Sequence, residues 1–147
     1  GNSVYITGQT QVALPGNSYA GNKDAFVAKY SSDGARQWVR QFGTSGLEEA
    51  QTIAVDNSGR IYVAGETNQS LFGSYYAGSD AWVAVYDSNG NRLKGLQIGT
   101  LGDDEIYGAT ITGNSLYLIG QTEGSFSGFS NQGSYDAWVA QYDLTLI

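Results

Sequence analysis

The sequence predicts an all-β protein made of β-propeller blades, each a four-stranded antiparallel sheet, with about two and a half blades in the chain. A motif of Asp-Ala-aromatic-Val-Ala, a variable residue and Tyr occurs at residues 24–30, 80–86 and 136–142. The copies start 56 residues apart, and a repeat of this kind is typical of propellers and solenoids. The segments around each copy are short, rich in β-branched and aromatic residues, and bounded by Gly, Asn, Asp or Ser, which indicates strands joined by tight turns.

Four strand-like segments recur in a fixed order. If the strands of a blade are lettered A to D from the axis outward, residues 50–55 suit strand A. The chain then reads B-C-D, A-B-C-D, A-B-C, and we expect residues 144–147 to open a last strand D. Residues 1–147 form one repeat array, with units at approximately 1–58, 59–112 and 113–147. The expected strands lie at 4–10, 24–30, 37–44, 50–55, 61–67, 80–86, 94–100, 106–111, 116–122 and 136–142.

The second copy of the motif is apolar on both faces of its strand. Residues 82, 84 and 86 share one face, residues 81, 83 and 85 share the other, and side chains alternate across a strand. A strand covered on both sides fits blades stacked face to face better than a half-solvated sheet. Between this strand and the next, Asn89-Gly90 predicts a type I′ hairpin turn.

These motifs resemble a known family, the SBBP or seven-bladed β-propeller type of repeat. The resemblance rests on residues 62–67 (Tyr-Val-Ala-Gly-Glu-Thr), 80–84 (Asp-Ala-Trp-Val-Ala) and 41–44 (Gln-Phe-Gly-Thr), in the family's order. It implies propeller blades from large bacterial repeat proteins that are often exported or attached to the cell surface. It implies no defined catalytic activity.

Composition excludes several classes of function. The net charge of −7 and the lack of a basic run argue against a nucleic-acid partner, which requires a positive surface. No apolar run is long enough for a membrane helix, so no membrane insertion is expected. With no His and no Cys, the chain holds no Ser-His-Asp or Cys-His machinery and no His-ligated zinc.

The motif aspartates Asp24, Asp80 and Asp136 are the best-placed polar residues. We interpret each as a turn cap that accepts backbone N–H groups, with Thr10, Thr67 and Thr122 nearby. The alternative is Ca²⁺ binding by loop carboxylates, and these three residues are its candidates. Residues 87–92 resemble the start of an EF-hand loop but carry Arg where that loop needs Gly. We therefore expect no cofactor, with Ca²⁺ as the alternative.

Two acidic clusters, at residues 48–49 and 103–105, precede the expected A strands. Paired carboxylates could act as acid and base on a glycosidic bond, but neighbouring loop residues do not hold them across a pocket. We interpret both clusters as solvated acidic turns.

Aromatic residues offer a further hypothesis, carbohydrate stacking. Phe26, Trp82 and Trp138 share one repeat position inside a strand, which favours core packing for them. The loop tyrosines are better candidates for binding a glycan, because loops carry recognition. They serve equally well as lids over blade edges, and both interpretations stay open. These tyrosines are Tyr19, Tyr75, Tyr76 and Tyr135.

The expected function is a non-catalytic structural and interaction module of an exported or cell-surface bacterial protein, and not an enzyme. Its expected partners are the remaining blades of a parent chain or neighbouring copies, and beyond these a protein or a glycan. A carbohydrate-binding propeller that uses the tyrosine-rich loops is the second hypothesis. A glycan-active enzyme whose site is completed elsewhere is the third.

Overall fold

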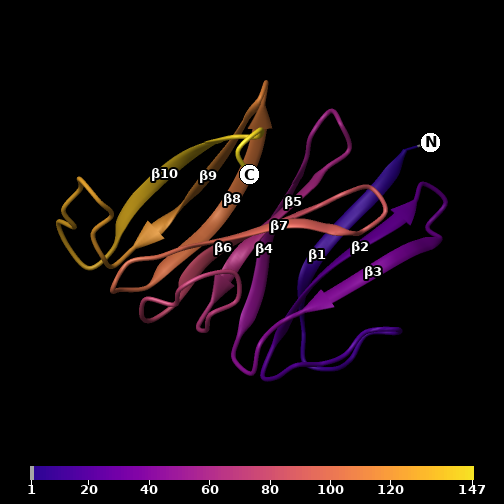
Figure 1. Ribbon diagram of the computed structural model, residues 1–147, viewed down its shortest axis with the longest axis horizontal. Coiled ribbons are helices and arrows are strands. Elements are labelled where there is room, and N and C mark those ends of the chain that lie inside the picture. The colour runs from indigo at the N-terminus through magenta and orange to yellow at the C-terminus, as the bar shows by residue number, and fades with distance from the viewer. Residues whose placement is uncertain (1) are drawn as a thin grey trace.

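Three antiparallel sheets stand side by side in the computed structural model, which describes residues 2–147 (Figure 1). Within these residues the sheets comprise ten strands and no helix. The strands are β1 (Ser3–Thr10), β2 (Asp24–Ser31), β3 (Arg36–Phe42), β4 (Glu48–Val55), β5 (Ile61–Thr67), β6 (Asp80–Tyr86), β7 (Arg92–Ile98), β8 (Asp104–Thr112), β9 (Ser115–Thr122) and β10 (Asp136–Asp143).

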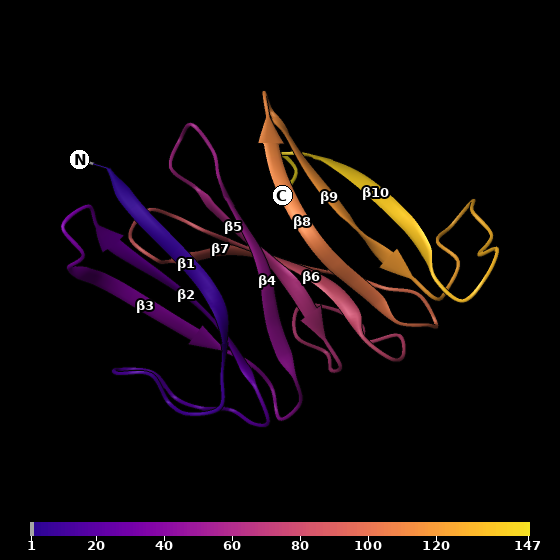
Figure 2. The same cartoon turned by 180° about the vertical axis from the view of Figure 1, so that it is seen from behind.

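The sheet orders are β1-β2-β3, β4-β5-β6-β7 and β8-β9-β10, and every pair is antiparallel. This is the B-C-D, A-B-C-D, A-B-C order expected from the repeat, so the chain is built of β-propeller blades. β4 lies between β1 and β8 and contacts both, as the views from the front and from behind show (Figures 1 and 2). The remaining strands of each sheet extend outward from them.

The expected last strand D at residues 144–147 is wrong. These residues form a turn, because Asp143 accepts hydrogen bonds from the backbone N–H and the hydroxyl of Thr145 at 2.8 and 2.7 Å. Leu144 is buried against the core between the second and third sheets, and its N–H donates to the carbonyl of Asn114 at 2.9 Å. The chain therefore turns toward the second sheet, where Arg60 donates to the carbonyl of Leu144, and adds no strand to the third.

Two apolar cores hold the sheets together, one on each face of β6. Trp82, Ala84 and Tyr86 belong to the core that the second sheet shares with the first. Residues 81, 83 and 85 belong to the core shared with the third sheet. All seven residues of β6 are buried, which confirms the prediction of a strand covered on both faces. Trp82 also forms a T-shaped contact with Phe42 from the first sheet, with ring centroids 5.4 Å apart.

The turn at Asn89-Gly90 is not type I′. That turn needs positive φ at both central residues, and among the described residues positive φ occurs only at glycines, here at Gly90 with φ of 79°. The N–H of Gly90 donates to the carbonyl of Asp87, and the carboxylate of Asp87 accepts the N–H groups of Asn89 and Asn91. The connection is a type I turn closed by a left-handed glycine, stabilised by the aspartate that precedes it.

Gly65 is required by a close approach of two strands. The register of β4 against β5 shifts between Ala50 and Thr52, so β4 carries a bulge opposite Gly65. A Cβ at Gly65 would lie 1.8 Å from the backbone oxygen of Glu49. Gly120 repeats this arrangement in the third blade, where a Cβ would lie 1.9 Å from the oxygen of Glu105. Neither glycine has positive φ, so strand contact, and not backbone conformation, explains these two residues.

Replacing Gly65 by Ala is expected to lower the free energy of unfolding by about 2 kcal/mol or more, because β4 or β5 must move to admit the methyl group. Gly133→Ala is the matched control, since a Cβ there meets no atom within 4 Å and φ is not positive. That variant should stay within about 1 kcal/mol of the wild type. Urea unfolding of the three proteins measures both values, and equal stabilities for the two variants would contradict the bulge argument.

Candidate functional site

The motif aspartates lie at the entry of the third strand position of each blade and accept hydrogen bonds from the loop before it. Asp24 Oδ2 accepts the N–H of Ala20 at 2.9 Å, and Asp80 Oδ2 accepts the N–H of Tyr76 at 3.1 Å. Asp136 Oδ2 accepts the N–H of Gln132 at 2.8 Å. These are the contacts that the capping interpretation expects, since an ordered loop needs acceptors for its backbone donors.

Each of the first two aspartates has a second partner that the sequence analysis missed. Gln41 Nε2 donates to Asp24 at 2.8 Å, and Gln97 Nε2 donates to Asp80 at 2.7 Å. Both glutamines lie on the outer strand of their blade, opposite the aromatic residue of the motif. The signal in the sequence is a recurring spacing, because aspartate and glutamine are 17 residues apart in both blades.

The acidic residue that opens each A strand is buried, so the interpretation of both acidic clusters as solvated turns is wrong for Glu48 and Asp104. Glu48 accepts the N–H and the hydroxyl of Thr44 at 2.6 and 2.7 Å. Asp104 accepts the N–H of Thr100, and also its hydroxyl at 2.9 Å. The first side chain of strand A points between two blades, where the preceding Gly-Thr loop supplies donors in place of water.

The three threonines expected near the motif aspartates lie directly opposite them in the paired strands: Thr10 opposite Asp24, Thr67 opposite Asp80 and Thr122 opposite Asp136. Their hydroxyls, however, donate to other acceptors. Thr67 Oγ1 donates to Glu48 at 2.8 Å and so binds the acid of strand A, not Asp80. Thr10 belongs to the first sheet, which has no strand A, and its hydroxyl donates to the carbonyl of Val12 at 3.0 Å. In the middle blade the threonine at the end of strand B therefore binds the carboxylate of its own inner strand, whereas the hydroxyl of Thr122 donates to the carbonyl of Gly124 at 3.4 Å.

Backbone hydrogen bonds complete each of the two blade junctions. The N–H of Glu48 donates to the carbonyl of Lys23 at 2.9 Å, and the N–H of Asp104 donates to the carbonyl of Ser79 at 2.6 Å. The acceptor in each case is the residue just before the motif aspartate. The start of one blade is thereby fixed directly to the third strand of the blade before it.

The second junction is less completely bonded than the first. Oδ1 of Asp80 and Oδ1 of Asp104 are buried and have no hydrogen-bond partner among residues 2–147. Burial raises the pKa of both carboxyls above the ordinary aspartate value, and the neighbouring charge of Asp80 raises the pKa of Asp104 further. Both oxygens of Asp24, at the first junction, accept N–H groups.

Because the two junctions are bonded differently, replacing the motif aspartate by asparagine should change the free energy of unfolding differently at each. Asp24→Asn places an amide N–H₂ against an N–H donor and should cost about 1–3 kcal/mol of unfolding free energy. Asp80→Asn turns an amide toward the oxygen of Asp104 and should be neutral or stabilising. A carboxyl whose pKa is raised by folding binds its proton more tightly in the folded state than in the unfolded state. The stability of the wild type therefore falls as the pH rises above about 4 and the carboxyl must carry its charge while buried. The advantage of Asp80→Asn over the wild type should therefore grow from pH 4 to pH 7.

Urea unfolding at these two pH values, with the wild type measured alongside, separates the outcomes. A cost for Asp80→Asn equal to that of Asp24→Asn at both pH values would show that the two junctions are bonded alike.

The calcium candidates lie apart. Asp24, Asp80 and Asp136 belong to three different sheets, and each is occupied by hydrogen bonds from its own loop. Across residues 2–147, no group of three or more His, Cys, Asp or Glu side chains is placed to hold a metal ion. Calcium binding stays a hypothesis for these residues.

A second set of carboxylates gathers on the inner strands. The pKa of Glu66 is raised, first by burial and then by the charges of Glu105 and Glu49. Glu49 forms an ion pair with Lys23, and Glu105 accepts a hydrogen bond from the hydroxyl of Tyr107. The charges of Glu49 and Glu105 thus act on Glu66, as neighbouring carboxylates in an enzyme would act on each other. None of them lines the groove beside β10 that is described below.

The aromatic residues of the motif differ between blades. Trp82 is fully buried in the middle blade, whereas Phe26 and Trp138 are half-buried in the two outer ones. Trp38 lies outside the motif and covers the turn of the next blade, where its Nε1 donates to the carbonyl of Ser88 at 3.2 Å. Packing within and between blades accounts for all four residues.

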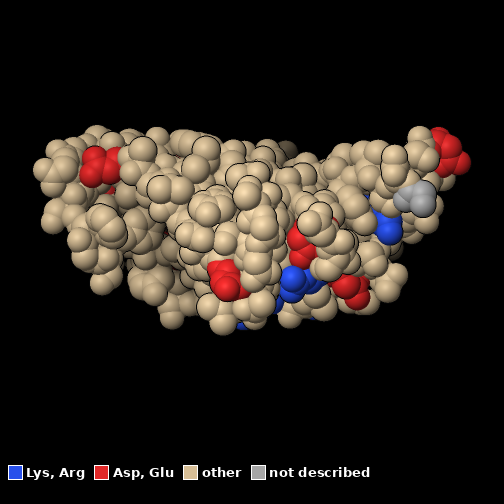
Figure 3. Space-filling model, turned by 90° about the horizontal axis from the view of Figure 1, so that it is seen from above, with Lys and Arg blue, Asp and Glu red and all other residues tan. Residues whose placement is uncertain are grey.

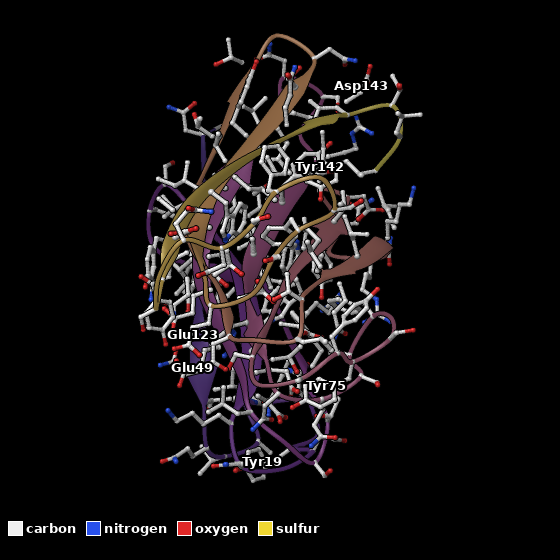
Figure 4. The ribbon with its side chains drawn as sticks, turned by 90° about the vertical axis from the view of Figure 1, so that its left-hand side faces the viewer. Tyr19, Glu49, Tyr75, Glu123, Tyr142 and Asp143 are labelled. Atoms are coloured by element: carbon white, nitrogen blue, oxygen red, sulfur yellow. The ribbon has the colours of Figure 1, made fainter. Side chains whose placement is uncertain are left out.

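The loop tyrosines are partly exposed and partly used inside the loops. The hydroxyl of Tyr75 donates to the carbonyl of Gly78 at 2.9 Å, and that of Tyr19 donates to the carbonyl of Asn22 at 2.5 Å. Tyr19 and Tyr75 lie toward one end of the blades, opposite the end that carries Tyr142 and Asp143 (Figure 4). Tyr76, 52% exposed, and Tyr135, 42% exposed, are the freest of the set. The rings are accessible, while two hydroxyls already hold their own loops closed.

Charged side chains are few and scattered on the face shown in Figure 3. No helix in the described part of the chain is long and apolar enough to cross a membrane.

The repeat architecture agrees with a match to a known family. Residues 37–73, from β3 to the loop after β5, match the family model of the beta-propeller repeat SBBP, and the chain contains this repeat. The chain is also similar to the regulatory protein FlaEY of Caulobacter vibrioides, with 29% identity over 108 residues. That alignment covers 68% of this chain and 11% of FlaEY, so the chain spans about a tenth of the length of this relative.

Proposed function

We propose that the chain is a non-catalytic scaffold segment of a larger β-propeller protein, exported or displayed on a bacterial surface. One observation carries the proposal: apolar positions that are buried in the middle blade are open on both outer blades. Val83 is 1% exposed, whereas Val139, at the same position of the third blade, is 70% exposed. At the other end Val4 is 51% exposed, while Ile61, its counterpart in the middle blade, is 0% exposed. Faces of this kind favour packing against further blades.

The placement of the carboxylates supports a structural role over catalysis. The acids of the blade junctions are buried and bonded to backbone and hydroxyl donors, so they serve the packing of blades. Glu66 and Glu105 would be the acid and base of a glycan-active enzyme completed elsewhere, which is the third candidate function. Neither of them lines the groove beside β10, so that groove does not place them on a bound sugar.

Carbohydrate binding is the second candidate, because the rings of Tyr75 and Tyr76 are exposed beside each other in sequence on one loop. A stacked sugar would use their faces. Export is inferred from composition, with many Tyr and Gly, seven Lys and Arg, and no Cys. Labelling of intact cells with a membrane-impermeant reagent tests that inference.

A glycan array tests the two leading candidates. The scaffold proposal predicts no glycan-selective binding by the wild type. The carbohydrate alternative predicts binding that Tyr75→Ala and Tyr76→Ala each reduce by about tenfold or more, because each ring would supply about 1.4 kcal/mol or more. Tyr107→Ala is the matched control, since this tyrosine is equally exposed but lies on β8. Selective binding that is lost in the two loop variants and retained in the control would overturn the scaffold proposal.

A further inference from the structure

In each of the first two sheets, one glutamine fastens the outer strand. Gln41 lies opposite Phe26, and Gln97 lies opposite Trp82. The amide nitrogen of each donates to the motif aspartate, at 2.8 and 2.7 Å. The amide oxygen accepts an N–H from the loop between the second and third strand positions, that of Leu14 at 2.7 Å or that of Leu71 at 2.9 Å. One side chain thereby joins the outer strand, its neighbour and the loop.

The third sheet has the receiving half of this arrangement. Asp136 occupies the position of Asp24 and Asp80, and its partner among the described residues is the backbone N–H of Gln132. Phe126 follows Thr122 by four residues, as Leu14 follows Thr10 and Leu71 follows Thr67. Asp136 and Phe126 both line the same groove.

This groove lies beside β10 and has a volume of about 520 Å³. Trp138, Tyr142 and Ile98 give it apolar walls, and Asp136 provides a carboxylate. Within residues 2–147, β10 is hydrogen-bonded to β9 alone, so its other edge presents N–H and C=O groups in a row. An edge of this kind is a template for an added strand, with backbone bonds giving affinity and neighbouring pockets giving selectivity.

We propose that this edge binds an extended segment with the outer-strand pattern of the repeat, Gln-apolar-Gly-Thr, as a fourth antiparallel strand. The glutamine of the segment lies opposite Trp138, donates to Asp136 and accepts the N–H of Phe126. The apolar residue after it lies opposite Ala137, as Phe42 lies opposite Ala25 and Ile98 lies opposite Ala81. The inference rests on the proposed scaffold function and specifies its partner: an extended polypeptide recognised by a carboxylate, not a sugar.

The test uses the ¹⁵N-labelled chain and a peptide with the sequence of residues 91–100, which carries the pattern Gln-Ile-Gly-Thr. The proposal predicts saturable amide shifts in β10 and in the loop at residues 123–133. Gln97→Leu in the peptide and Asp136→Ala in the chain should each weaken binding by about tenfold or more, because a buried hydrogen bond to a carboxylate is lost. Asp143→Ala is the matched control, as it removes a charge from β10 beyond the paired stretch and should leave affinity unchanged.

A free ten-residue peptide loses much conformational entropy when it binds as a strand. A second experiment therefore joins a copy of residues 88–100 to the C-terminus of the chain through a flexible Gly-Ser linker. The tethered strand should raise the melting temperature and slow hydrogen exchange at the amides of β10, and a tethered copy with Gln97→Leu should do so less. Absence of protection in both formats would overturn the proposal. The proposal would also be overturned if neither Gln97→Leu nor Asp136→Ala weakened the affinity for the peptide. Sedimentation showing that the chain dimerises through its β10 edge would overturn it too.

Failure of this inference is distinguishable from failure of the scaffold function. A chain that binds glycans through its loop tyrosines and also binds the peptide refutes the scaffold function alone. If the chain binds neither glycans nor the peptide, only the added-strand proposal is refuted.

Discussion

The carboxylate that opens strand A is the contact on which the stacking of blades depends. Glu48 reaches into the space between two sheets and accepts three hydrogen bonds, two from the loop that enters its blade and one from Thr67. Its own N–H is bonded to the carbonyl of Lys23 in the previous blade. The apolar cores on the two faces of β6 join the three sheets, but hydrophobic packing is not directional. The junction bonds set how one blade is placed on the next.

Much of the architecture could be predicted from the sequence because it is repeated. The 56-residue spacing and the apolar character of both faces of residues 80–86 predicted stacked blades and the correct order of strands. The Asn89-Gly90 turn was predicted wrongly because the dipeptide alone favours type I′, whereas Asp87 stabilises a longer turn through its carboxylate. Local sequence does not show how many residues of a turn the flanking strands leave unpaired.

The site was harder to predict because it forms between units that are distant in sequence. Glu48 and Glu49 are adjacent acids, and the usual behaviour of such pairs is exposure to solvent. Only the packing of two sheets shows that the first points into a junction and the second toward Lys23. Gln41 and Gln97 were overlooked for the same reason, since a polar residue on an outer strand has no obvious partner until the motif aspartate lies beside it. Most of the distinctive polar residues thus hold blades and loops in place, and this use of them supports the scaffold interpretation.

The most direct test of this account is the unfolding free energy of Glu48→Ala compared with Glu49→Ala at neutral pH. The two residues are neighbours in sequence and identical in type, but Glu48 is fully buried with three hydrogen bonds, whereas Glu49 forms a partly buried ion pair with Lys23. Glu48→Ala should cost about 3 kcal/mol or more, because it leaves buried donors without an acceptor. Glu49→Ala should cost about 1 kcal/mol or less. Equal and small losses in the two variants would contradict the central role of the junction carboxylate.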